Sequence, residues 1–388
     1  MSGLLASAAD RTLEAWRPVA LAFSPILGAV VGSFLNVCIY RLPRKGLTVA
    51  RPRRSFCPSC GTPLAWHDNV PLLSWLLLRG RCRHCQAPIS FRYFAVEALT
   101  AALFFAIARR WLVEGQVSAG ASIATAALAS ALVVAAFIDL DLRIIPDEIT
   151  LRGILLVPPL ALLVPDLQGP RPDANVALVL AEAARAFEPL ASAAPAWIRS
   201  GPGLAAAAGA CAAGLYALVS RLEAAASRRR SPGEPSPRHA RRFWGWLAGS
   251  SGGVFALGAL RPEWLFEPRV QSFWAAMWGM AVGASLVFAI GVAGSWVFRK
   301  PAMGLGDVKL MALLGAFTGW VGVVEGFFLA CFLGALVGMP ILIRAKLRSP
   351  REPCYVPFGP FLALGCMVIV LWPSALEGAF RWYVGLFR

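Results

Sequence analysis

Long apolar stretches recur along this chain, and short polar or charged segments separate them. Five stretches carry no charge and are long enough to cross a hydrocarbon layer of about 30 Å. They are 18–40, 118–138, 201–220, 272–298 and 355–376. Shorter or charge-bearing candidates follow at 93–113, 149–165, 243–260, 310–324 and 326–343. The alternation therefore predicts about ten transmembrane helices.

Composition agrees with this pattern. The 388 residues are 58% hydrophobic and 15% charged, with a mean hydropathy of +0.63, which is more apolar than an ordinary soluble domain. We expect an all-α polytopic membrane protein, a helical bundle of about eight core and two inserted transmembrane helices with a small cytoplasmic module. The predicted units are an outer tail at 1–17, a first transmembrane helix at 18–40, the module at 41–92, a bundle segment at 93–165, an inserted segment with a transmembrane hairpin at 166–270, and a second bundle segment at 271–388.

The formal net charge of +16 has two readings, a nucleic-acid partner or an orientation signal. In a polytopic protein Lys and Arg collect in cytoplasmic loops. Segment 41–92 holds ten basic residues and one acid, Asp68; 228–242 holds six arginines, and 344–351 holds four basic residues. We assign these three segments to the cytoplasm, place the N-terminus outside, and expect no nucleic-acid partner. Arg109 and Arg110 then fall on the outer side, against this rule.

Two C-x-x-C pairs lie in the module, Cys57 with Cys60 and Cys82 with Cys85. Each pair has the spacing that supplies two thiolates to one tetrahedral metal ion. A cytoplasmic position argues against disulfides. We therefore expect a closed, structural zinc site, which stabilises a segment too small to build its own core. Free or redox-active thiols are the alternative, and His84 is a competing ligand.

Carboxylates form the second group of candidate residues. Asp139 comes directly after a predicted inward-running helix, and three further acids follow it. These are Asp141, Asp147 and Glu148. Asp307 lies at the inner end of a different predicted helix, so Asp139 and Asp307 are expected at the same membrane face. Ionisable residues at membrane helices are costly and commonly functional.

Asp307 also follows two glycines, Gly304 and Gly306, in the sequence "GLGD". Glycine permits backbone conformations closed to other residues and a close approach of a substrate strand. Two carboxylates within hydrogen-bonding reach share a proton, so that one activates water and the other protonates the scissile carbonyl. The pair Asp139 and Asp307 therefore indicates aspartic protease chemistry.

Several longer blocks carry a family resemblance. They are "GSFLNVCIYRLP", the cysteine-bearing segment from "CPSCGTPLAW" to "CRHCQAPIS", "RYFAVEALTA", "IDLDLRIIPDEIT", "MGLGDVKL" and "VPFGPFLALG". In these blocks the chain resembles the type IV prepilin peptidases, bacterial inner-membrane members of the GxGD aspartic proteases. The family's two catalytic aspartates fall on Asp139 and Asp307. The interval between them is longer than the family usually carries.

The resemblance implies cleavage of the basic leader of type IV pilin-like or pseudopilin precursors at the cytoplasmic membrane face. It also implies N-methylation of the new N-terminus with S-adenosylmethionine. No glycine-rich dinucleotide-type motif marks a site for this methyl donor. A leader rich in Lys or Arg is expected to contact Asp141, Asp147 and Glu148, which also fit a solvated turn. The basic cysteine-bearing loop is expected to rest on anionic lipid headgroups.

Two other classes of protein fit part of the pattern. A proton-coupled transporter uses intramembrane carboxylates, but it favours acids near the middle of the bilayer and related repeats. A non-catalytic membrane scaffold with a zinc module for partner binding is the second alternative. Loss of precursor processing on replacing one aspartate separates a protease from both.

Overall fold

The computed structural model describes residues 2–44, 46–51, 54–113, 118–168, 268–299, 303–348 and 356–372. Within these ranges the regular elements are helices. The cysteine-bearing module consists mostly of turns and irregular segments with isolated bridges. The predicted inserted hairpin at 201–220 and 243–260, with the basic loop between its arms, lies outside the described residues. The described residues comprise the cysteine-bearing module and most of the predicted core helices.

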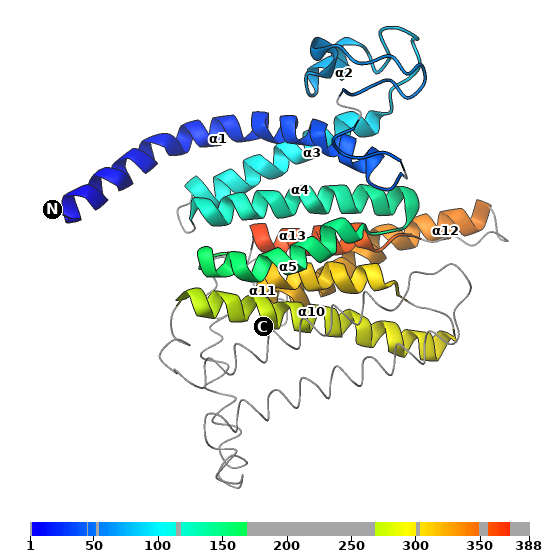
Figure 1. Cartoon of the computed structure of the whole chain (residues 1–388). Coiled ribbons are helices and arrows are strands. Elements are labelled where there is room, and N and C mark those ends of the chain that lie inside the picture. The colour runs from blue at the N-terminus through cyan, green and yellow to red at the C-terminus, as the bar shows by residue number, and fades with distance from the viewer. Residues whose placement is uncertain are drawn as a thin grey trace, which may run out of the picture.

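The core helices lie side by side in a bundle (Figure 1). Their bounds are α1 Ser2–Arg41, α3 Phe91–Ile107, α4 Ala119–Leu142, α5 Asp147–Leu163, α10 Pro268–Phe298, α11 Leu305–Leu333, α12 Met339–Arg348 and α13 Gly359–Leu371. Two π-helical turns, η2 Ala108–Val113 and η5 Gly334–Gly338, extend α3 and α11. The module between α1 and α3 contains η1 Trp66–Asn69 and α2 Leu73–Leu77. The predicted outer tail is part of α1, which bends along its length (Figure 1) and contains Pro18 and Pro25.

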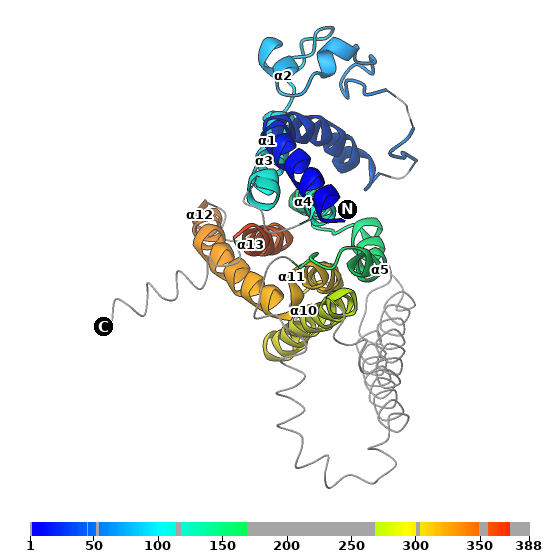
Figure 2. The same cartoon turned by 90° about the vertical axis from the view of Figure 1, so that its left-hand side faces the viewer.

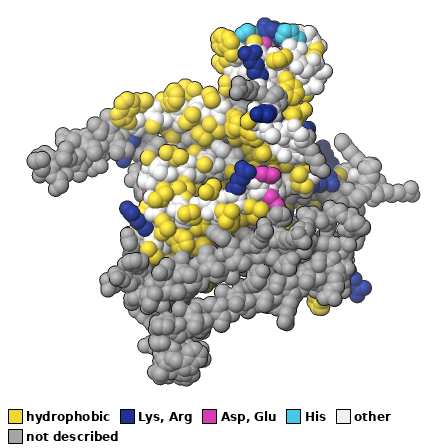
Figure 3. Space-filling view, in the orientation of Figure 1, with side chains coloured by type: hydrophobic (Ala, Val, Ile, Leu, Met, Phe, Trp, Pro, Cys, Tyr) yellow, Lys and Arg dark blue, Asp and Glu magenta, His cyan; other side chains and the backbone are white. Residues whose placement is uncertain are grey.

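Five candidate spans among the described residues are long and apolar enough to cross a membrane. They are Trp16–Arg41, Phe91–Arg110, Ala119–Leu142, Pro268–Phe298 and Leu305–Ala345. Hydrophobic side chains cover much of the described bundle surface (Figure 3). Apolar side chains on the outside of a bundle are expected where lipid is the solvent. These findings confirm the prediction of a polytopic helical membrane protein.

The fifth candidate span reverses direction inside α11, at Gly319. If α11 were one straight helix, Met311 and Val323 would lie about 18 Å apart along its axis. A Cβ atom on Gly283 of α10 would nevertheless meet both, at 2.3 Å from the Met311 carbonyl oxygen and 3.0 Å from Val323 Cγ2. Gly319 has φ 70° and ψ 179°, a conformation open to glycine. The spans predicted at 310–324 and 326–343 thus correspond to two arms. The turn between them is at Gly319, before the predicted boundary after residue 324.

Polar side chains stabilise the end of the bundle where this turn lies. Gln168 Nε2 donates to the Ala316 carbonyl at 3.2 Å and to the Ser272 carbonyl at 3.1 Å, and Ser272 Oγ donates to Gln168 Oε1 at 2.7 Å. The Ala316 carbonyl belongs to the last turn before Gly319, where helix carbonyls lack intrahelical partners. Gln168 therefore caps the first arm of α11 and ties α5, α10 and α11 together.

Main chains of neighbouring helices touch at glycines. A Cβ atom on Gly279 would lie 1.9 Å from the Gly315 carbonyl oxygen, and one on Gly315 would lie 2.0 Å from the Gly279 carbonyl oxygen. Likewise, a Cβ on Gly365 of α13 would lie 2.4 Å from the carbonyl oxygen of Gly326 in α11. Small residues permit this approach in lipid, where no hydrophobic effect drives helices together. Seen along the bundle, α11 lies between α10, α5 and α13 (Figure 2).

We expect Gly279→Ala to destabilise the bundle by about 1–3 kcal/mol, the usual range for overpacking, because its Cβ would overlap the main chain of α11. The measurement is thermal unfolding of the purified protein in detergent. Gly338→Ala is the matched control, since its Cβ would meet only Val356 Cγ1 at 3.7 Å. Equal unfolding temperatures for Gly279→Ala and the unaltered protein would show that the α10–α11 contact is looser than described.

Candidate active site and metal centre

Asp139 lies in the last turn of α4 and is buried, with 6% of its surface exposed. Its Oδ2 accepts a hydrogen bond of 3.1 Å from the backbone N–H of Gly359, the first residue of α13. A Cβ atom at position 359 would lie 2.6 Å from the same oxygen, so glycine is required for this approach. Sequence reasoning did not identify Gly359 as a site residue, because nothing local links it to a carboxylate on another helix.

Asp307 lies in the first turn of α11, and Gly304 is the N-cap residue of that helix. The backbone N–H of Asp307 donates to the Gly304 carbonyl at 3.2 Å. A Cβ atom on Gly304 would lie 3.6 Å from Asp307 Oδ2, so the glycine leaves space beside the carboxylate. The predicted "GLGD" turn is therefore a helix start that presents Asp307 at the end of the bundle.

The two aspartates lie at the same end of the bundle. Ile145 lies between Gly306, which precedes Asp307, and Gly359, which bonds to Asp139. A Cβ on Gly306 would meet Ile145 Cβ at 3.3 Å, and one on Gly359 would meet Ile145 Cδ1 at 3.4 Å. The glycines beside the two carboxylates thus contact the same Ile145 side chain. Asp139 bonds to the first residue of α13, and Asp307 lies in the first turn of α11. The positive ends of both helix dipoles therefore favour a negative charge at this place. Close carboxylates resist a second charge.

The other three acids predicted near the site occupy the same end, and two have basic partners. The Asp141 carboxylate pairs with the guanidinium of Arg92 at the start of α3. Asp147 Oδ1 accepts from Lys309 Nζ at 2.7 Å, which joins the start of α5 to the start of α11. Glu148 is exposed and forms no ion pair among the residues that the structure describes. Of the three, Glu148 is therefore the most available to a basic ligand.

The four cysteines of the module come together as a possible metal centre. Sγ atoms of Cys57, Cys60, Cys82 and Cys85 all lie within 4.8 Å of one another. Each C-x-x-C pair forms the same turn: the N–H of the first cysteine bonds to the carbonyl five residues on, and its carbonyl accepts from the residue four on. Two matched turns facing each other supply the four thiolates of a tetrahedral site.

Local hydrogen bonds favour a thiolate in this cluster. Side-chain and backbone hydrogen bonds from Thr62 lower the pKa of Cys60 to about 6. Because the thiolate is the form that binds metal, this arrangement fits a metal centre. Among the described residues, His67 and His84 are outside the cluster, so the predicted set of four sulfur ligands needs no histidine.

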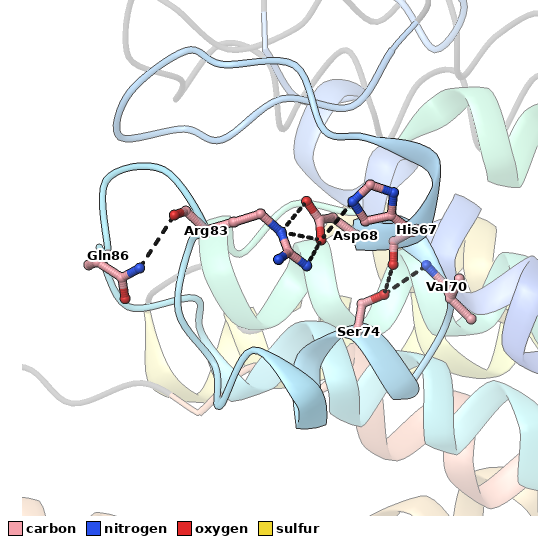
Figure 4. A network of polar contacts seen from close by, with 6 residues as sticks. All are labelled: His67, Asp68, Val70, Ser74, Arg83 and Gln86. Carbon is pink, nitrogen blue, oxygen red and sulfur yellow. Dashed lines mark hydrogen bonds and ion pairs between the residues drawn. The ribbon is translucent and has the colours of Figure 1, made fainter.

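A polar network stabilises the module between the two cysteine turns (Figure 4). Arg83, from the second turn, donates from Nε and Nη2 to Asp68 Oδ1 at 2.9 and 2.7 Å. Ser74 Oγ donates to the His67 carbonyl and accepts from the Val70 N–H, both at 2.9 Å. The hydrogen bond from Arg83 holds the pKa of Asp68 below its usual value, so the Asp68–Arg83 pair persists near neutral pH.

Two family models match the chain: Bacterial Peptidase A24 N-terminal domain over residues 26–111, and Type IV leader peptidase family over residues 244–339. The chain is 31% identical over 336 residues to a prepilin leader peptidase/N-methyltransferase of Myxococcus xanthus, covering 86% of this chain and 67% of that protein. It is 28% identical over 392 residues to a protein of the same name from Aeromonas hydrophila, covering 95% and 94%. No solved structure gives a significant match. The chain therefore belongs to the type IV leader peptidase family.

Proposed function

We propose that this protein is a membrane aspartic endopeptidase that removes the basic leader of type IV pilin-like precursors and methylates the N-terminus that cleavage exposes. The observation that carries the proposal is that Asp139 and Asp307, from separate helices, lie at one end of the bundle beside glycines that contact the same Ile145 side chain. The relatives named prepilin leader peptidase/N-methyltransferase support both activities. We place the site at the cytoplasmic face of the inner membrane, on the side of the basic module.

In the proposed reaction the two carboxylates share one proton. One activates a water molecule, and the other donates its proton to the scissile carbonyl, as in other aspartic dyads. The Gly359 N–H holds Oδ2 of Asp139, which leaves Oδ1 for the water. The absence of a side chain at Gly304, beside Asp307 Oδ2, lets a substrate main chain approach the carboxylate more closely. Acids confined to one end of a bundle fit hydrolysis at the membrane surface better than a proton path through the bilayer.

The cysteine cluster is proposed to hold one structural zinc ion. Four sulfur ligands within 4.8 Å leave no position for substrate, so zinc would stabilise the module rather than act on the peptide bond. Methylation requires a methyl donor, S-adenosylmethionine by family resemblance. The described residues contain no strand followed by a glycine-rich turn and helix, and no residue is assigned to bind this donor.

Replacing either dyad aspartate by asparagine is expected to abolish leader cleavage. Asn keeps the shape of the side chain but removes the shared proton, so general acid–base catalysis of about 10²–10⁴-fold should be lost. The measurement is the rate of conversion of a pilin-like precursor by purified Asp139→Asn or Asp307→Asn.

Asp141→Asn and Asp147→Asn are the controls for that experiment. They remove a neighbouring carboxylate but leave the dyad, so we expect weaker leader binding at most. Substantial cleavage by Asp307→Asn, together with its loss in Asp141→Asn, would show that the dyad is assigned to the wrong residues.

Glu148→Gln is expected to raise KM for a precursor with a Lys- or Arg-rich leader about two- to fivefold, the range of an exposed ion pair. A precursor whose leader has these residues changed to Gln should not distinguish the two enzymes. The measurement is steady-state cleavage of both substrates. An equal rise in KM for both leaders would exclude a charge contact between Glu148 and the leader.

Metal analysis should find about one zinc ion per chain, as expected for one four-ligand site. Cys57→Ser should lose the zinc, whereas Cys331→Ser, which replaces an exposed cysteine outside the cluster, should retain it. Cleavage should persist in Cys57→Ser because the dyad belongs to the bundle. A zinc content near zero in protein purified without chelators would contradict this assignment.

A further inference from the structure

Another buried carboxylate, that of Glu97 in α3, lies beneath the cysteine-bearing module. It is 9% exposed. Its Oε2 accepts the backbone N–H of Leu72 at 2.8 Å, and the Ser33 side chain of α1 is a second hydrogen-bond partner. No Lys, Arg or His pairs with Glu97 among the described residues. Buried carboxylates are usually matched by a cation, so one that lacks a cation can accept a ligand that brings positive charge.

Asn36 of α1 adds an unpartnered acceptor at the same place. It is 5% exposed, and its Nδ2 donates to the Tyr93 carbonyl at 3.0 Å, while its Oδ1 has no hydrogen-bond partner. Tyr93 and Glu97 lie one turn apart on α3, and Ser33 and Asn36 lie one turn apart on α1. Residues at this spacing on a helix are about 5–6 Å apart. The Asn36 amide therefore lies beside the turn of α3 that carries Glu97.

A basic residue on each of the two helices of this junction has other partners. Arg41 donates to the carbonyls of Val49 and Arg54, and Arg92 pairs with Asp141. The α1–α3 contact is also close, since a Cβ on Gly32 would lie 2.7 Å from Glu97 Cα. A carboxylate and an amide oxygen are both acceptors, and a primary ammonium offers three N–H donors. The junction thus has the chemistry to bind a primary ammonium group.

The junction also lies close to where such a group would be produced. Glu97 is five residues beyond Arg92, about 7.5 Å along α3, and Arg92 pairs with Asp141, two residues beyond Asp139. Asp139 is about 3 Å along α4 from Asp141, and packed helices lie about 8–10 Å apart, so Glu97 is on the helix beside Asp139 and about one turn deeper. Leader cleavage at the dyad would release a new α-amino group at this end of the bundle.

We propose that Glu97 and Asn36 bind the α-ammonium group of the cleaved substrate and form the acceptor site for its methylation. This inference rests on the function proposed above. An ammonium nitrogen has no lone pair, so an N–H bond must break before the nitrogen can be alkylated. The Glu97 carboxylate takes that proton, forming an O–H bond. The freed lone pair would then form the N–C bond as the methyl–sulfur bond of S-adenosylmethionine breaks, with S-adenosylhomocysteine as the leaving group.

Leu72, at the start of α2, contacts Glu97 through its main chain. Its N–H donates to Glu97 Oε2 and so occupies one acceptor position of that carboxylate. Its φ of 62° is uncommon for a residue other than glycine. Strained residues of this kind cluster at ligand-binding positions. An entering ammonium group replaces the Leu72 N–H at Oε2, so substrate binding displaces the start of α2 and couples the site to the module.

The first test is binding without a methyl donor. A synthetic peptide with the sequence that follows the leader, carrying a free N-terminal amine, is compared with its N-acetylated form by fluorescence anisotropy in detergent. The unaltered protein should prefer the free amine at least tenfold, and Glu97→Gln should lose that preference. Glu325→Gln, which makes the same chemical change on another membrane helix, should retain it. No preference in the unaltered protein, or its persistence in Glu97→Gln, would overturn the site.

The second test uses the mass of the product after a pilin-like precursor and S-adenosylmethionine are supplied. Glu97→Gln should cleave within about twofold of the unaltered protein but methylate at least 100-fold more slowly, as expected for loss of a proton acceptor. A residue that only docks the module would tolerate Gln, because its amide oxygen still accepts the Leu72 N–H. Equal methylation by both would therefore overturn the proposal. Absence of methylation in the unaltered protein would refute the methyltransferase half of the function, while the binding test still decides the ammonium site.

Discussion

The helices of this bundle touch through their main chains at glycines, and the positions of the sites follow from that contact. A Cβ atom would overlap the facing carbonyl where α10 meets α11 and where α13 meets α11. Such close contact fixes how far each helix can shift along its neighbour. It places the start of α13 against Asp139 and the start of α11 beside Ile145. Two carboxylates from distant parts of the sequence can therefore remain in register without a direct bond between them.

Electrostatics at this end of the bundle combines opposing effects. Burial disfavours a charged carboxylate, whereas two helix N-termini and the Gly359 N–H favour one. A single negative charge shared by two carboxylates satisfies both conditions. The ion pairs Arg92–Asp141 and Lys309–Asp147 link the neighbouring helices at the same level. They occupy two acids that the sequence suggested for leader contact, which leaves Glu148 more accessible.

The sequence was sufficient to predict features that depend on local pattern. Span-length apolar runs predicted the core helices, and paired C-x-x-C spacing predicted the cysteine cluster. The order and direction of the apolar runs also predicted that Asp139 and Asp307 lie at the same end of the bundle. The particular contacts between helices were not predictable. The turn at Gly319 lies within an uninterrupted apolar run, so no polar residue marks it. Gly359 and Glu97 gain their roles only from partners on other elements, and their surroundings in the sequence carry no sign of those partners.

If Asp139 and Asp307 act as one catalytic unit, a double-mutant cycle of the two aspartates will show it. The cleavage rate of a pilin-like precursor is measured for the unaltered protein, Asp139→Asn, Asp307→Asn and the double variant. Residues that act as a unit are strongly non-additive, so the account predicts that the double variant is no slower than either single variant. Losses that multiply, with measurable cleavage in each single variant, would contradict a shared-proton dyad.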